Sequence, residues 1–178
     1  MRLLLVVVAA LSAGLASAQT GMLGVGGGVS WEVRPEGFSG RDFLRGDDPS
    51  LVVTAGAHLG ADTLVRLQAR DLSRTTLVGG APWTGRLRAY TVGTDYFVPG
   101  TFGQACFSGG VGVYRLDLAG ENAPAGVESQ EFGWYLGVGE WFRLSHRGRL
   151  VGEIVMDRTG HPGTPTLLTA NVMLVVQF

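Results

Sequence analysis

The sequence predicts an all-β fold: an eight-stranded antiparallel up-and-down transmembrane β-barrel. Three observations predict it. Apolar residues recur at every second position, the alternating segments are long, and the connections between them alternate between long and short. No stretch after residue 18 sustains the i, i+3, i+4, i+7 spacing of an amphipathic helix. The chain of 178 residues is long enough for one such domain.

The first alternating segment, residues 22–32, shows the pattern most simply. Leu23, Val25 and Val29 alternate there with glycines and polar residues, and the polar set ends at Glu32. Successive side chains of a strand point to opposite faces, so this segment has one apolar face and one small or polar face. The same alternation defines the other predicted strands, which are 51–60, 63–71, 86–97, 104–116, 132–144, 150–158 and 166–178.

The lengths of the strands and of their connections favour a membrane barrel. Most predicted strands have about nine to thirteen residues, whereas strands of soluble sheets average about five or six and a tilted membrane strand needs about 9–11. An up-and-down barrel with alternating connections has one end with long loops and one with tight turns, as outer-membrane barrels do. The long connections are 33–50, 72–85, 117–131 and 159–165, and the short ones are 61–62, 99–103 and 145–149.

The first eighteen residues have the features of a secretion signal. A short basic start at Met1-Arg2 precedes an apolar run over residues 3–11, and Ala16-Ser17-Ala18 fits the small-x-small cleavage pattern. The alternative, a membrane anchor, needs a longer apolar run than this one. We therefore expect a signal peptide at 1–18 and an outer-membrane β-barrel domain at 19–178.

A secreted soluble barrel of the lipocalin type is the main alternative fold. In such a barrel the apolar face would point inward and the polar face would meet water. The polar face here is rich in glycine, which suits a crowded interior better than a solvated strand face. Aromatic residues also lie near predicted strand ends, where they fit interfacial girdles: Trp31, Tyr96, Phe97, Trp134, Trp141, Phe142 and Phe178.

Composition excludes several classes of function. The formal net charge is −1 and every basic residue is Arg, so a basic nucleic-acid patch and a Walker-A loop, which needs Lys, are not expected. The single cysteine, Cys106, excludes an internal disulfide and a cysteine-rich zinc site. Asp47-Asp48 supplies too few oxygens for a calcium site, so we expect neither metal nor cofactor.

Charged residues on the polar faces predict an ionic network in the barrel interior. An eight-stranded barrel is just wide enough to be filled by its own side chains, and buried charges must pair. We expect Arg66 or Arg70 to pair across the interior with a carboxylate, forming a structural plug. A gated ion path or a catalytic site is the alternative. The network candidates are Glu32, Arg66, Arg70, Asp95, Glu153 and Asp157; Arg88 is out of phase with Asp95.

The chain lacks an obvious nucleophile–histidine–acid arrangement. A barrel that deacylates lipid A would need a serine beside a histidine on its outer wall. His161 lies near Thr159 and Thr164 in sequence, but no serine stands beside it. His58 and Cys106 fall on the interior phase, where packing is the simpler role. No catalytic residue is therefore assigned.

Three stretches resemble the small OmpA/OmpX-type outer-membrane β-barrel domains. They are the glycine-rich run 109–115, the run 132–142 followed by Gly152-Glu153, and the alternating C-terminal segment ending at Phe178. The resemblance implies the outer membrane of a diderm bacterium, with outer-membrane lipids as partners. It also implies that the barrel-assembly machinery reads Phe178 as an assembly signal.

The same resemblance implies a role in envelope integrity or surface adhesion through external loops whose ligand is unknown. A narrow channel or a binding barrel for small hydrophobic compounds is an alternative, disfavoured if Tyr135 and Met173 meet across the interior. A lipid-A-modifying surface enzyme is a further alternative. The sequence departs from the family pattern at Glu140, which falls on the lipid phase of 132–144 unless a bulge resets the register. We also expect no peptidoglycan-binding domain after Phe178.

Overall fold

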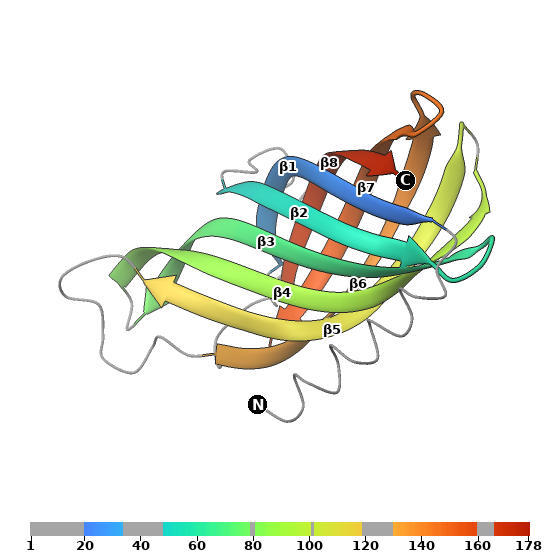
Figure 1. The fold of residues 1–178 in the computed structure, drawn as a ribbon. Coiled ribbons are helices and arrows are strands. Elements are labelled where there is room, and N and C mark those ends of the chain that lie inside the picture. The colour runs from blue at the N-terminus through green and yellow to red at the C-terminus, as the bar shows by residue number, and fades with distance from the viewer. Residues whose placement is uncertain (1–19, 34–47, 79–80, 101, 119–129, 160–165) are drawn as a thin grey trace.

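The computed structural model is a closed barrel of eight antiparallel strands in which β1 pairs with β8 (Figure 1). The predicted fold class is confirmed. The structure describes residues 20–33, 48–78, 81–100, 102–118, 130–159 and 166–178. Among these residues no helix is long and apolar enough to cross a membrane. The strands are β1 (Gly21–Val33), β2 (Asp48–His58), β3 (Thr63–Val78), β4 (Ala81–Pro99), β5 (Gln104–Leu118), β6 (Gln130–Arg143), β7 (Gly148–Thr159) and β8 (Thr166–Gln177).

Strands β3 and β4 are longer than the sequence pattern predicts. Residues 72–85, predicted to be a connection, mostly continue these strands as a hairpin in which pairing runs out to Val78 and Ala81. The prediction was wrong because it took the end of the apolar alternation as the end of each strand. Beyond the apolar part of the barrel β3 and β4 still pair with each other. This backbone pairing does not require that one face of the hairpin is buried. The other strands begin and end within a few residues of their predicted bounds.

The barrel closes where the two described ends of the chain meet. The amide of Gly21 donates to the carbonyl of Phe178 at 2.8 Å, and the amide of Phe178 donates to the carbonyl of Gly21 at 2.9 Å. Both residues lie at the end of the barrel that carries the short connections 59–62, 100–103 and 144–147. Closure leaves no free sheet edge, which is the condition for a sheet to lie in hydrocarbon.

The outer wall of the barrel carries an apolar belt. Large hydrophobic residues in the outward phase of the strands are about half exposed, in contrast to their buried neighbours one residue away. On β2, for example, Val53 is 50% exposed whereas Val52 is fully buried. We define the belt by the exposed strand residues Leu23, Val25, Leu51, Val53, Leu67, Tyr90, Phe107, Val111, Trp134, Leu136, Val138, Ile154, Val172, Leu174 and Val176.

Two of the aromatic residues assigned to the girdles face the interior instead, and a third, Trp31, is only 9% exposed. Phe97 and Trp141 are 4% and 3% exposed, so their assignment to the outer wall was wrong. Each belongs to a pair of adjacent aromatic residues, and alternation allows only one of each pair to face outward. On β4 the outward member is Tyr96, which is 55% exposed. Phe178 is exposed at the short-connection end, as a girdle residue would be.

Glu140 keeps the outward phase that the sequence pattern gives it. Pairing of β6 with β5 and β7 runs without interruption past this residue, so no bulge resets the register. Its neighbours across the strands are Ala105 and Gly152, which leave room for the carboxylate. Glu140 Oε1 accepts a hydrogen bond from the amide of Phe102 at 2.8 Å. This glutamate therefore binds the β4–β5 connection rather than entering the interior.

Candidate functional site

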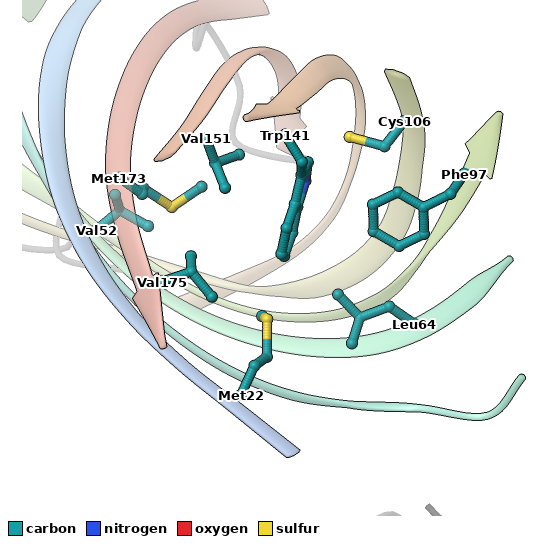
Figure 2. Packing of buried hydrophobic residues seen from close by; sticks show 9 residues of the cluster. All are labelled: Met22, Val52, Leu64, Phe97, Cys106, Trp141, Val151, Met173 and Val175. Atoms are coloured by element: carbon teal, nitrogen blue, oxygen red, sulfur yellow. The ribbon is translucent and has the colours of Figure 1, made fainter. Parts of the chain in front are cut away.

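The interior side chains form three layers along the barrel axis. The layer nearest the short connections is apolar, and Figure 2 shows its nine side chains converging inside the strands. The rings of Phe97 and Trp141 pack edge to face with centroids 5.2 Å apart. The ring of His58 stacks on that of Phe97, with centroids 5.7 Å apart. The layer consists of Met22, Val52, Leu64, Phe97, Cys106, Trp141, Val151, Met173 and Val175.

The middle layer is ionic, and its first half is built around Arg66 on β3. Arg66 Nη1 donates to Glu153 Oε2 at 2.8 Å, and Arg66 Nη2 lies 3.3 Å from Asp95 Oδ1. Glu153 Oε1 also accepts from Gln68 at 3.5 Å and from Asn171 at 3.4 Å. All five side chains are buried. One guanidinium therefore holds carboxylates from β4 and β7, and neutral amides satisfy the second oxygen of Glu153.

The second half of the middle layer is built around Arg70 and Asp157. Arg70 Nη1 donates to Asp157 Oδ2 at 2.7 Å, and Arg70 Nη2 bonds to Oδ1 of the same carboxylate. The hydroxyl group of Tyr114 donates a hydrogen bond to Asp157 Oδ1 at 2.6 Å. The Arg70 guanidinium also lies over the ring of Tyr135, 5.4 Å from its centroid. Such a two-pronged arginine–carboxylate pair is the strongest form of buried ion pair.

The ionic layer ties opposite walls of the barrel together. β3 carries both arginines and β7 carries Glu153 and Asp157, and in the ring of eight strands β3 and β7 are four strands apart in either direction. The structure thus brings together Arg66, Arg70, Asp95, Glu153 and Asp157. The side chain of Glu32, the sixth predicted member, lies outside what the structure describes. Arg88 faces outward and pairs with Asp117 at 3.2 Å.

The third layer lies towards the long connections and is apolar again. It consists of Leu72, Leu87, Ala89, Tyr114, Leu116 and Leu167. Tyr114 joins this layer to the ionic one because its ring packs here while its hydroxyl reaches Asp157. On β3 the sequence order Leu64, Arg66, Gln68, Arg70, Leu72 follows the layers from one end to the other.

Two interior glycines make room for the tyrosines that cross the barrel. A Cβ at Gly110 would lie 2.6 Å from Cε1 of Tyr135, and a Cβ at Gly133 would lie 2.6 Å from Cε2 of Tyr114. Real Cβ atoms are essentially never this close to another heavy atom. The glycine-rich strands therefore provide the narrow interior with the space its two large polar rings occupy.

We expect Gly110→Ala or Gly133→Ala to destabilise the barrel by about 1–3 kcal/mol, because each added methyl group collides with a buried tyrosine ring. The measurement is urea unfolding of the protein refolded in lipid vesicles. Gly152→Ala is the matched control, since nothing lies within 4 Å of a Cβ there. An equal effect at Gly110 and Gly152 would contradict the crowding argument.

His58 and Cys106, which carry an imidazole and a thiol on the interior phase, pack against their neighbours. His58 contacts Phe97 and the side chain of Gln177, whose Nε2 lies 3.2 Å from His58 Nε2. Cys106 is a buried free thiol. No group of His, Cys, Asp and Glu among the described residues could hold a metal ion. The hydrolase candidate His161 and the loop residue Asp47 lie outside the described residues.

Sequence reasoning did not select Tyr114, Gln68 and Asn171 for the network. Their signal was present, because each lies on the interior phase of its strand and carries a hydrogen-bonding group. The inward register of Asp95 required a choice, since Asp95 and Arg88 could not both face inward. The structure places Asp95 inside, fully buried. The role of Phe178 as an assembly signal stays a prediction.

Comparison with known proteins finds the same fold at low sequence identity. The N-terminal β-barrel domain of Pseudomonas aeruginosa OprF matches with a TM-score of 0.61 and 12% identity over 90% of this chain and 99% of that one. Ail, the attachment invasion locus protein of Yersinia pestis, matches with 0.61 and 11% over 89% and 98%. Neisserial surface protein A matches with 0.63 and 8% over 89% and 96%. No protein-family model and no curated protein matches the sequence.

Proposed function

We propose that this chain is an outer-membrane barrel of a diderm bacterium, with a closed interior and a role carried by its long loops. That role is envelope integrity or surface adhesion, without catalysis or conduction. The observation that carries the proposal is the combination of an apolar belt on the outer wall with a self-paired ionic layer inside. The outer wall suits lipid, and the interior uses its charges to hold the walls together.

The membrane location is supported by the belt and by backbone closure. Side chains such as Leu136 and Val172 are 53% and 58% exposed in the middle of paired strands, which is unfavourable over so wide a surface in water. All strands have two partners, so hydrocarbon meets no unpaired sheet edge. The matching fold of OprF, described as an N-terminal β-barrel domain, and of the Pseudomonas outer-membrane protein OprG agrees with this location.

The layers of the interior favour a structural barrel over a channel. A solute would have to pass the apolar layer around Trp141 and then the ion pairs of Arg66 and Arg70. Tyr135 and Met173 are each 1% exposed, so both bulky side chains occupy the interior. Breaking the ion pairs to open a path would leave unpaired buried charges, which is strongly unfavourable.

The asymmetry of the barrel supports a surface role through the loops. The long connections share one end, opposite to the short turns and the described chain ends. At that end β3 and β4 extend as a hairpin to Val78 and Ala81. The neighbour Ail is named the attachment invasion locus protein, and its structure is also known in complex with the heparin analogue sucrose octasulfate. Surface attachment is therefore the form of loop function that we favour.

The test is fractionation of cells that express the full chain, followed by reconstitution. We expect the protein in outer membranes and expect its band to shift on heating before electrophoresis, as a folded barrel's band does. The same purified protein added to a planar bilayer should leave the conductance at its background level, because the interior is filled. Cells carrying it should adhere to extracellular surfaces, and replacement of residues 119–129 by a short linker should abolish adhesion.

Each result has a contrary outcome. Recovery of the protein from the periplasm or medium without detergent would contradict the membrane location. Stable unit conductance would contradict the closed interior and favour the channel alternative. A change in the mass of lipid A upon expression would contradict the non-enzymatic proposal. Unchanged adhesion in the linker variant, with a normal heat-shifted band, would assign adhesion to another part of the protein. Absence of adhesion with the wild-type protein would leave envelope integrity as the role of this barrel.

A further inference from the structure

The outer wall of the barrel carries a group of charged side chains on β3, β4 and β5, towards the long connections. Arg86 and Arg88 flank Leu87 on β4, and Arg115 follows Tyr114 on β5. Leu87 and Tyr114 are fully buried, so the alternation of each strand points the three arginines outward. We call the group the outer-wall arginine patch; it consists of Asp71, Arg86, Arg88, Arg115 and Asp117.

The outer-wall arginine patch continues the outward face of the apolar belt. On β4, Arg88 is followed on the same face by Tyr90, which is 53% exposed and belongs to the belt. Cross-strand pairing joins Arg88 to Arg115 and Tyr90 to Val113, so a charged row lies directly beside an apolar row. Both rows face the same surroundings. In the membrane location proposed above, the arginines therefore lie where hydrocarbon gives way to headgroups, in the leaflet next to the long connections.

The outer-wall arginine patch is positive, and its own ion pairs are exposed. Asp117 accepts a hydrogen bond from Arg115 Nε at 2.7 Å and lies 3.2 Å from Arg88 Nη1, whereas Asp71 lies 3.6 Å from Arg86 Nη1. Three arginines against two aspartates leave one net positive charge. The side chains of Arg86 and Arg115 are 63% and 57% exposed, and such pairs contribute little to stability. A phosphate group can therefore compete with the aspartates for these guanidinium groups.

We propose that the outer-wall arginine patch binds the phosphate groups of lipid A in the external leaflet of the outer membrane. This inference rests on the proposed function and names a lipid partner for the outer wall. Guanidinium groups bind phosphate oxygens in pairs. A headgroup with more than one phosphate can engage arginines of β4 and β5 together, whereas a phospholipid offers a single phosphate. Tyr90 and Phe132, both exposed beside the patch, then contact the acyl chains of the same lipid.

The experiment follows backbone amide resonances of residues 86–90 and 113–117 in the full chain refolded in a non-ionic detergent. Diphosphorylated lipid A is titrated in, and dephosphorylated lipid A and phosphatidylglycerol are titrated separately. We expect saturable shifts with the first lipid and much weaker ones with the other two. Arg86→Gln and Arg115→Gln should each weaken lipid A binding about fivefold. Arg147→Gln is the control, because it removes the same charge from an exposed position at the opposite end of the barrel and should leave binding unchanged.

Asp117→Asn should have an effect of the opposite sign. It removes the carboxylate that competes with phosphate for Arg88 and Arg115, and it raises the net charge of the patch by one. We expect this variant to bind diphosphorylated lipid A about fivefold more tightly than the wild type. A patch that only stabilises the sheet would not bind lipid more tightly after the loss of an ion pair.

Equal binding of dephosphorylated lipid A or of phosphatidylglycerol would overturn the inference, because the patch would then not select a headgroup with several phosphates. Equal weakening by Arg147→Gln, or weaker binding by Asp117→Asn, would overturn it as well. Asp117→Asn also tests the patch if an arginine variant fails to fold. A wild-type barrel that inserts into bilayers without a preference for lipid A overturns this inference alone, whereas failure to insert overturns the proposed function.

Discussion

Asp157→Asn is expected to lower the free energy of unfolding by about 3–5 kcal/mol, as removal of one partner from a buried ion pair does. Asp157 is fully buried and accepts hydrogen bonds from both terminal nitrogens of Arg70 and from the hydroxyl of Tyr114. Asparagine has almost the same shape but no charge. Arg70 would then be a buried cation without a counter-ion, and this accounts for most of the expected loss.

Urea unfolding in lipid vesicles, followed by tryptophan fluorescence, measures this loss. A double variant, Arg70→Met with Asp157→Leu, separates the charge effect from the packing effect. It should be far more stable than Asp157→Asn, because no unpaired charge is left in the interior. Arg115→Gln is a matched control, since Arg115 also pairs with an aspartate but is well exposed, and it should change stability by less than about 1 kcal/mol.

A loss below about 1 kcal/mol for Asp157→Asn would show that water reaches this carboxylate and solvates Arg70 in its place. The ionic layer would then be hydrated enough to admit small solutes, and the channel alternative would gain support. A double variant no more stable than the single one would instead attribute the loss to packing around Tyr114. The first result would change the proposed function, because that proposal depends on an interior closed by its own ion pairs.

Strand phase explains why much of the interior could be predicted from the sequence. A side chain's face follows from counting by two, so Arg66, Arg70, Glu153 and Asp157 could all be assigned inward without coordinates. Which of them meet is a different question, because it depends on the stagger between strands that are not neighbours in sequence. Arg66 could have met several carboxylates. The structure pairs it with Glu153 and Asp95 through register around the barrel.

Two errors of the sequence reasoning have a common physical cause. The girdle assignment of Phe97 and Trp141 relied on nearness to strand ends, while their strand phase already pointed inward. The connection predicted at 72–85 relied on loss of apolar alternation, while strand pairing continued to Val78. In both cases one signal was used where two were needed. The position of a residue along its strand determines its depth in the barrel, and the strand phase determines whether its side chain faces inward or outward. Backbone pairing between two strands can continue beyond the segment in which apolar residues alternate.

Val53→Arg is expected to distinguish a membrane barrel from a soluble one. Val53 lies midway along β2 (Asp48–His58), is 50% exposed, and has Val25 and Ala69 as cross-strand neighbours. If the belt faces lipid, an arginine here sits near the bilayer midplane and costs about 2–4 kcal/mol. If the belt faces water, the same change at an exposed position should stay within about 0.5 kcal/mol. Urea unfolding in vesicles measures the difference.

Leu59→Arg is the control, because Leu59 is 51% exposed and directly follows β2 in the short connection. The two positions thus match in exposure and differ in depth, since Leu59 lies at the level where headgroups begin. In a membrane barrel Leu59→Arg should cost no more than about 1 kcal/mol, leaving a clear gap to Val53→Arg. Similar small costs at both positions would mean that depth has no effect. The apolar belt would then be a solvated surface, and the soluble barrel would be the correct fold assignment.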